Sequence, residues 1–138
     1  MLSLENITQL LQEWCRERPV RLCVVFGSQA TGRAHQYSDV DLAVWPARVL
    51  STPERLRWVR QLEDLLGQNV SLVLVSVDLD PVLGMEIFRQ RHLVYECEPE
   101  LWFHQRLQLW HAYNDSLPFI RTARQQLHDF AEEVRHGS

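Results

Sequence analysis

Two short groups of residues in the first third of the chain have the types and spacing that phosphate chemistry requires. Gly27 and Ser28 follow an apolar run, and after ten further residues Asp39 and Asp41 stand in the next one. A glycine lets the backbone approach a ligand closely, and free N–H groups with a hydroxyl at the start of a helical segment bind phosphate. Gly27 and Ser28 therefore predict a phosphate-binding turn.

The two aspartates predict a site for divalent cations. In a strand, side chains alternate, so Asp39 and Asp41 point to one side while Val40 and Leu42 point to the other. Placing two carboxylates in an apolar strand is unfavourable unless cations neutralise them, and Mg²⁺ prefers oxygen ligands. A phosphate-binding turn beside a carboxylate pair predicts a nucleoside triphosphate site in which metal ions clamp the oxygens of an in-line displacement.

Apolar periodicity and helix signals predict the elements that position these groups. The expected helices cover residues 4–16, 53–66 and 81–90, with Ser3, Thr52 and Asp80 as N-caps and Gly67 as a C-terminal stop. The expected strands cover residues 20–26, 40–45, 69–77 and 92–96. The run at 69–77 is apolar on both faces, which is typical of a central strand.

The remainder of the chain is helical in pattern from Pro99 onward, with Pro118 either starting a second helix or kinking one long one. This order predicts an α/β (α+β) fold in which helices pack on a mixed β-sheet. At 138 residues the chain has the length of one domain. We expect a core over residues 1–98 and a C-terminal helical extension of the same domain over residues 99–138.

Composition narrows the classes of function. The net charge is -4, so the chain has too little positive charge for binding to duplex DNA. No apolar run is long enough to span a membrane and the first residues lack a secretory pattern, which predicts a soluble, cytoplasmic protein. The three cysteines are widely spaced and are expected to be reduced.

The stretch GSQATGRAHQYSDVDLAV resembles the signature of the DNA polymerase β-like nucleotidyltransferases, which is Gly-Ser, ten residues and Asp-x-Asp. The resemblance covers residues 20–96. The small size, the segment DPVLGMEIFRQRHLVYE and the helical tail further resemble the minimal nucleotidyltransferase (MNT) antitoxins that accompany HEPN ribonuclease toxins.

The resemblance implies a polymerase-β-like fold and Mg²⁺-dependent transfer of AMP from ATP to a hydroxyl, in this subgroup a tyrosine of the partner toxin. Asp39 and Asp41 would be the catalytic and metal-binding residues. Gly27, Ser28 and Ser38 would bind the nucleotide. The family often has a basic residue at the position of Thr31, and the nearby Arg33 is a candidate phosphate contact in its place.

The chain departs from the family at a third carboxylate. The family commonly carries it within Val-Asp-Leu-Val, where this chain has Val70-Ser71-Leu72-Val73. Asp78 and Asp80 are the nearest substitutes, but Asp80 is explained as a helix cap and Asp78 would lie on the opposite strand face from Ser71. Ser71 cannot serve as a carboxylate base, and loss of such a base typically slows a reaction by about 10²–10⁴-fold.

Two kinds of function remain open. The chain is either an adenylyltransferase, or a binding module that neutralises the toxin by contact with weak or no catalysis. Transfer to a small hydroxylated molecule is less favoured, because little chain is left to build a second substrate lobe. The C-terminal extension, residues 99–138, is unusually rich in aromatic residues. This indicates either core packing or an interface with the toxin or a second copy.

Overall fold

The computed structural model describes residues 3–27, 39–90 and 92–136. Four helices and four strands occur in this part of the chain. The helices are α1 (Leu4–Arg16), α2 (Thr52–Leu66), α3 (Pro81–Arg89) and α4 (Leu101–His136). The strands are β1 (Val20–Phe26), β2 (Val40–Pro46), β3 (Val70–Leu74) and β4 (His92–Glu96).

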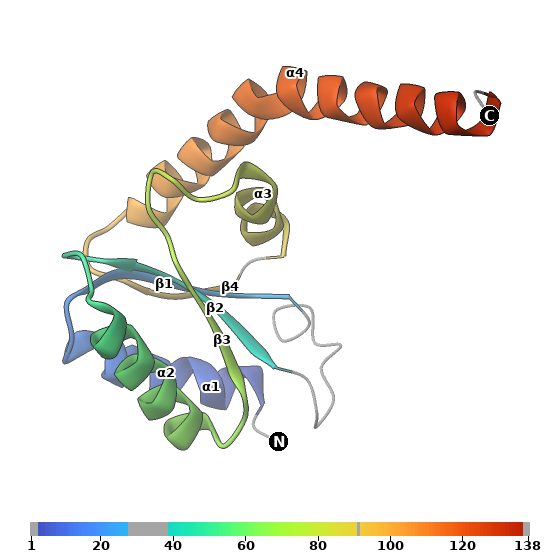
Figure 1. The fold of residues 1–138 in the computed structure, drawn as a ribbon. Coiled ribbons are helices and arrows are strands. Elements are labelled where there is room, and N and C mark those ends of the chain that lie inside the picture. Colours follow the sequence, from blue (N-terminus) through green and yellow to red (C-terminus); the bar gives the residue numbers. More distant parts are fainter. Residues whose placement is uncertain (1–2, 28–38, 91, 137–138) are drawn as a thin grey trace.

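The strands form a mixed sheet in the order β3-β2-β1-β4. Strand β1 runs antiparallel to both β2 and β4, whereas β3 runs parallel to β2. Helices α1 and α2 cover one face of the sheet, while α3 and the first turns of α4 cover the other (Figure 1). The predicted mixed sheet with helices packed on it is confirmed.

The prediction that the third strand is central was wrong. Strand β3 lies at an edge of the sheet and ends at Leu74, three residues before Val77. Its side chains nevertheless contact apolar residues on both faces, because Leu72 packs in the core beneath α1 and α2 and Val73 packs against the core on the other side. Apolar residues on both faces therefore indicate helical cover on both faces, and say nothing of how many neighbouring strands there are.

The helix ends follow local capping chemistry. Ser3 accepts a hydrogen bond from the backbone N–H of Asn6 at the start of α1, and Gly67 ends α2 with a φ of +66°. The N-cap of α2 is Ser51 and not the expected Thr52. Ser51 forms a reciprocal capping box with Glu54, which satisfies two terminal N–H groups at once.

The sheet separates two apolar clusters. Val40, Leu42 and Val44 point into the cluster beneath α1 and α2. Ala43 and Trp45, which alternate with them, point into the cluster beneath α3 and α4. Since Asp41 has the same parity as Ala43, its side chain lies on the α3 and α4 side of the sheet.

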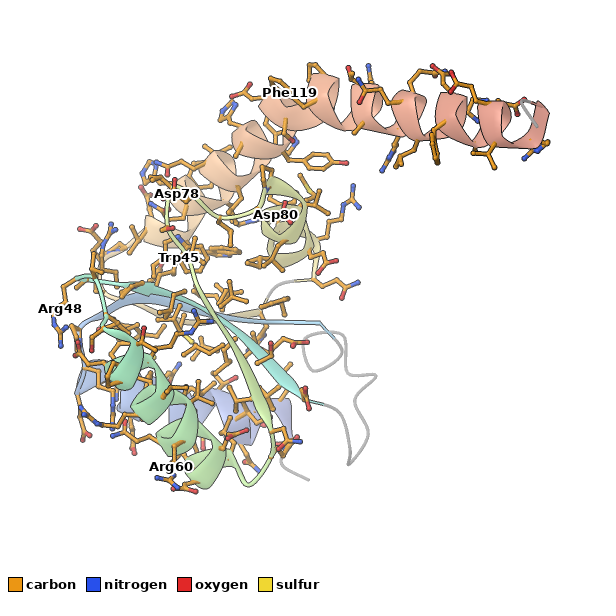
Figure 2. All side chains as sticks on the ribbon, viewed as in Figure 1. Trp45, Arg48, Arg60, Asp78, Asp80 and Phe119 are labelled. Atoms are coloured by element: carbon orange, nitrogen blue, oxygen red, sulfur yellow. The ribbon has the colours of Figure 1, made fainter. Side chains whose placement is uncertain are left out.

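Helix α4 is one long helix that contains Pro118, so the kinked alternative is confirmed. Its direction changes near Phe119 (Figures 1 and 2). Leu101, Trp102 and Leu109 in its first turns are buried. Among the described helices, none combines the length and apolarity that crossing a membrane would take.

Candidate functional site

Gly27, directly after β1, and Asp41, in β2, come into close contact. Phe26 at the end of β1 pairs with Asp41 across the antiparallel ladder, so the next residue lies beside this carboxylate. Gly27 has a φ of +71°, and a Cβ added to it would overlap Asp41 Oδ2 and lie 3.2 Å from Asp41 Cγ. Only glycine satisfies both the left-handed backbone and this approach.

The two predicted aspartates are close enough to interact electrostatically. Asp39 lies just before β2 and is exposed, whereas Asp41 is partly buried. Burial raises the pKa of Asp41 above its ordinary value, and the negative charges of Asp39 and Glu86 raise it further. An excess of negative charge therefore gathers at this end of the sheet, where a cation would be stabilised.

Glu86 is a residue of this site that sequence reasoning missed. It belongs to α3, which packs on the same side of the sheet as Asp41, and its side chain is exposed. Gly84, Met85 and Ile87 around it are buried, so it is an acidic residue in the most apolar stretch of that helix. An acidic residue among apolar ones could have marked Glu86 as a candidate site residue. The sequence does not reveal, however, which part of the sheet α3 covers.

Ser71 lies beside Asp41. The two residues are Cα partners in the parallel pair of β2 and β3, and Ser71 is exposed. The position at which the resemblance implies a third carboxylate is thus next to Asp41, and this chain places a neutral hydroxyl there.

Asp78 and Asp80 do not supply the missing acid. Leu74 at the end of β3 pairs with Val44, three residues beyond Asp41 along β2, and the chain then leaves the sheet. Asp80 accepts a hydrogen bond from the N–H of Val82 as the N-cap of α3. Figure 2 shows both aspartates near α3 and α4, where β3 has already ended.

The other predicted nucleotide-binding residues, Ser28, Arg33 and Ser38, lie outside the described residues, as does Thr31. Their roles stay predictions from the sequence. Of the residues predicted to bind metal or nucleotide, Gly27, Asp39 and Asp41 lie within the described part of the chain.

The described carboxylates fit a magnesium ion whose other ligands are phosphate oxygens of a triphosphate. Over residues 3–27, 39–90 and 92–136, no group of three or more His, Cys, Asp or Glu side chains is arranged to hold a metal ion. Mg²⁺ commonly takes only one or two carboxylates and completes its octahedral shell with phosphate oxygens and water. Asp39 and Asp41 match that donor set, and the bare Cα of Gly27 gives the Asp41 carboxylate the room that a Cβ would otherwise take.

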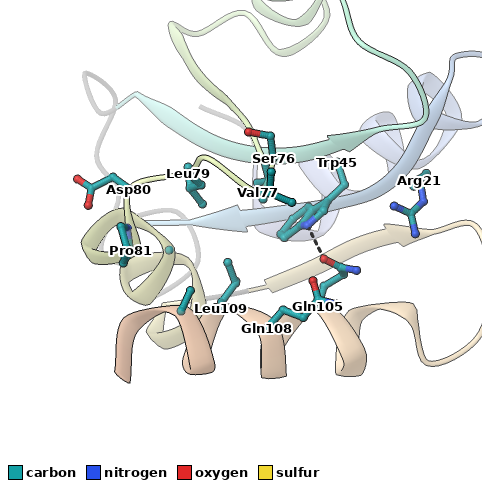
Figure 3. Close-up of a pocket in the computed structure, with 13 residues that line it drawn as sticks. Arg21, Trp45, Ser76, Val77, Leu79, Asp80, Pro81, Gln105, Gln108 and Leu109 are labelled. Atoms are coloured by element: carbon teal, nitrogen blue, oxygen red, sulfur yellow. Dashed lines mark hydrogen bonds between the residues drawn. The ribbon is translucent and has the colours of Figure 1, made fainter. Parts of the chain in front are cut away.

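A pocket of about 360 Å³ lies at the far end of β2 (Figure 3). Its walls come from β1, the end of β2, the segment between β3 and α3, the start of α3, and α4. Within it the indole N–H of Trp45 donates to Gln105 Oε1 at 3.0 Å. Four residues of strand, or roughly 13 Å, separate Trp45 from Asp41, so this pocket is distinct from the carboxylate site.

Comparison with known proteins identifies the family. The family model described as "Polymerase beta, Nucleotidyltransferase" matches residues 5–100. The protein adenylyltransferase MntA of Thermococcus cleftensis is 40% identical over 80 residues, which cover 55% of this chain and 81% of that protein.

Solved structures show the same fold. The MNT antitoxin in complex with the tri-AMPylated HEPN toxin of Shewanella oneidensis has a TM-score of 0.70 at 18% identity, covering 94% of this chain and 98% of that one. A mutant of the MntA toxin–antitoxin complex has a TM-score of 0.69 at 22% identity, covering 95% and 99%. With a family model matched over more than half of its length, the chain belongs to the polymerase β nucleotidyltransferase family.

Proposed function

We propose that this protein transfers AMP from ATP to a tyrosine hydroxyl of a HEPN ribonuclease toxin, and that it thereby acts as a cytoplasmic antitoxin. The observation that carries the proposal is the approach of Gly27 to Asp41, with Asp39 near enough to raise the pKa of Asp41. The relative from Thermococcus cleftensis is named a protein adenylyltransferase, and one structural neighbour is a complex with a tri-AMPylated HEPN toxin.

ATP is the nucleotide that we expect this protein to use. A further toxin–antitoxin structure of the same fold contains AMP-PNP, an ATP analogue, and has a TM-score of 0.60. In this chain Asp39 and Asp41 would hold Mg²⁺, which neutralises the charge of the phosphates when it is bound. Gly27 would let the backbone lie close to both the triphosphate and the Asp41 carboxylate, because a Cβ at this position would collide with Asp41.

The transfer itself exchanges one bond to phosphorus for another. The acceptor oxygen forms a bond to the α-phosphorus, the bond to the bridging oxygen breaks, and pyrophosphate leaves with that electron pair. The proton of the acceptor hydroxyl passes to water or to a nearby carboxylate. Ser71, although it lies beside Asp41, cannot take up that proton as a carboxylate would.

The serine at this position also supports a second candidate function. A site that lacks the third acid but keeps Asp39 and Asp41 could bind nucleotide with little transfer, and the protein would then neutralise the toxin by contact alone. General-base assistance is typically worth about 10²–10⁴ in rate, so its loss slows transfer without abolishing it. A slow enzyme is therefore favoured over an inactive one.

The test is co-expression with the HEPN partner, followed by intact-mass measurement of that partner. We expect an added mass of one or more adenylyl groups with the wild type and none with Asp41→Asn. Asp64→Asn is the matched control, because Asp64 is an exposed acid on α2, away from the site, and this variant should modify the toxin normally. Unmodified toxin that is nevertheless neutralised by both the wild type and Asp41→Asn would establish the binding module instead.

Ser71→Asp tests the same site in the opposite direction. If the lack of a carboxylate beside Asp41 limits the rate, a carboxylate at position 71 should accelerate transfer by about 10²–10⁴-fold. The rate of mass increase in a reconstituted mixture of toxin, ATP and Mg²⁺ measures this effect. An unchanged rate would mean that proton removal does not limit the reaction.

A further inference from the structure

The last part of α4, residues 119–136, carries an apolar surface that none of the described residues covers. We call these residues the tail. It points away from the body of the molecule beyond the bend near Phe119 (Figures 1 and 2). Its large apolar side chains are all well exposed where the structure describes them: Phe119 by 80%, Leu127 by 69%, Phe130 by 64% and Val134 by 64%.

The spacing of these residues forms a seam. Ala123, Leu127, Phe130 and Val134 follow one another at intervals of four, three and four residues. That alternation keeps apolar side chains on one side of a helix and is the repeat by which two helices pack against each other. Most helical stability in proteins comes from packing an apolar face. A projecting helix of about 27 Å with such a seam would therefore be stabilised by a partner that covers its apolar side chains.

The charges of the tail indicate which partner fits. Its first half, residues 119–127, contains Arg121 and Arg124 and no acidic residue, giving a formal charge of +2. Its second half, residues 128–136, contains Asp129, Glu132 and Glu133 with Arg135, giving 1 - 3 = -2 with histidine neutral. The tail therefore carries opposite charges at its two ends.

This pattern is complementary to itself in one orientation. When two tails run antiparallel, the basic half of each lies against the acidic half of the other, whereas parallel tails place like charges together. The antiparallel partner also brings positive charge to the C-terminal end of α4, where acidic residues are unfavourable because of the helix dipole. An antiparallel pair is symmetric about a two-fold axis, so both copies use the same surface.

We propose that the tail is a self-association surface, and that two copies of this chain pair through their tails in antiparallel orientation. Leu127 of each copy packs opposite Phe130 of the other, and Ala123 opposite Val134. The two nucleotidyltransferase domains then lie at opposite ends of the paired helices. This inference rests on the tail alone and is independent of the activity proposed above.

The first test is the mass of the purified full chain in solution, measured by sedimentation velocity over a range of concentrations. We expect about twice the monomer mass of 16.3 kDa for the wild type. The double variant Leu127→Glu with Phe130→Glu should dimerise at least about tenfold more weakly. Phe103→Ser is the matched control, because Phe103 is an exposed aromatic residue of α4 outside the tail and this variant should remain dimeric.

A second test measures orientation. In a Cys97→Ser background, which removes the exposed cysteine, Gln126→Cys and Glu133→Cys are prepared separately and treated with a short bismaleimide. In the antiparallel pair, Glu133 of one copy lies about 3 Å along the helix axis from Gln126 of the other and about 14 Å from its own counterpart. Glu133→Cys should therefore cross-link efficiently with Gln126→Cys and only weakly with itself. If Glu133→Cys cross-links with itself as efficiently as with Gln126→Cys, the pair is parallel and the proposed orientation is overturned. A wild-type chain that stays monomeric at high concentration, or a tail that associates only with the HEPN toxin, would overturn the proposal itself.

Discussion

Gly27 shows how a single residue can be fixed by both backbone and neighbour. Its φ of +71° alone favours glycine, but Gly67 has almost the same φ, +66°, and no atom within 4 Å of an added Cβ. The two glycines therefore separate the backbone effect from the contact with Asp41. A left-handed backbone typically costs a non-glycine residue about 1–2 kcal/mol.

We expect Gly67→Ala to lower the free energy of unfolding by about 1 kcal/mol and to leave nucleotide binding intact. Gly27→Ala should lose more stability, because its methyl group also displaces Asp41, and should lose binding of Mg²⁺-ATP. Urea denaturation and calorimetric titration with the nucleotide measure the two effects. Equal behaviour of the two variants would mean that the approach to Asp41 does not matter.

Asp41 should destabilise the fold at neutral pH. Its pKa is raised by burial and by the charges of Asp39 and Glu86, so the folded state binds the proton more tightly than the unfolded state. The stabilisation that comes with protonation is complete below the unfolded pKa and is lost as the pH rises through the folded pKa. We expect Asp41→Asn to raise the Tm at pH 7, with a gain that shrinks in acid. A lower Tm for this variant at pH 7 would contradict this account.

The contribution of Glu86 can be measured separately. Because its negative charge is one of the causes that raise the pKa of Asp41, Glu86→Gln should shift that pKa back toward its ordinary value. The shift should be partial, since burial is the largest cause and remains. Carboxyl ¹³C NMR titration follows Asp41 directly, and Asp64→Asn serves as the control that should leave the titration unchanged.

At the scale of elements, both edges of the sheet are held by side chains of the helices beneath them. Glu63 of α2 accepts a hydrogen bond from the Val70 N–H at 3.1 Å, and Arg55 donates to the carbonyl of Leu72 at 3.1 Å. At the opposite edge, Gln12 of α1 donates to the carbonyl of Val94 at 3.1 Å. These bonds satisfy edge groups that would otherwise be open to pairing with another chain.

The bond from Glu63 should matter for β3, the strand that carries Ser71. Glu63→Ala leaves the Val70 N–H without its acceptor, and we expect a loss of about 1 kcal/mol in the free energy of unfolding. The Val70 amide should also exchange faster with solvent. Asp64→Ala is the matched control. Asp64 is adjacent and exposed, so this variant should change the free energy of unfolding by less than about 0.5 kcal/mol. If both variants have the same free energy of unfolding, the hydrogen bond from the Val70 N–H to Glu63 contributes nothing to the stability of β3.

Most elements could be predicted from the sequence because their signals are local. Ser3, Gly67 and Asp80 act on neighbouring backbone groups, so three helix ends were found at the correct residues. The order of the strands depends on contacts distant in sequence, and for this reason β3 was expected at the centre of the sheet. The position of Glu86 depends in the same way on where α3 docks.

At the scale of the whole molecule, the sheet separates two regions on its α3 and α4 side. The carboxylates and Gly27 lie where β1 ends and β2 begins, and the pocket beside Trp45 lies at the other end of β2. The turn-and-carboxylate spacing predicted the first region, because one hairpin pairing brings Gly27 to Asp41. The pocket was not predicted, because it is assembled from parts of β1, β2, α3 and α4 that are distant in sequence.

Binding at the carboxylate end should stabilise the entire fold. The negative charges of Asp39 and Glu86 repel that of Asp41 in the free protein, and a cation shared by Asp39 and Asp41 removes part of that repulsion. A ligand present at 100 times its Kd adds about 2.7 kcal/mol to the stability of a folded protein. For a chain of this size that corresponds to a rise in Tm of roughly 5–10 °C.

We therefore expect saturating Mg²⁺ with a non-hydrolysable ATP analogue to raise the Tm of the wild type by this amount, and EDTA to reverse the rise. Asp41→Asn should have the higher Tm without ligand and the smaller rise with it, because the same carboxylate both destabilises the free protein and binds the cation. Differential scanning calorimetry measures both quantities in one experiment. A full ligand-induced rise in Asp41→Asn would place the metal elsewhere in the molecule, whereas a reduced rise without a higher starting Tm would mean that Asp41 binds the cation without straining the fold.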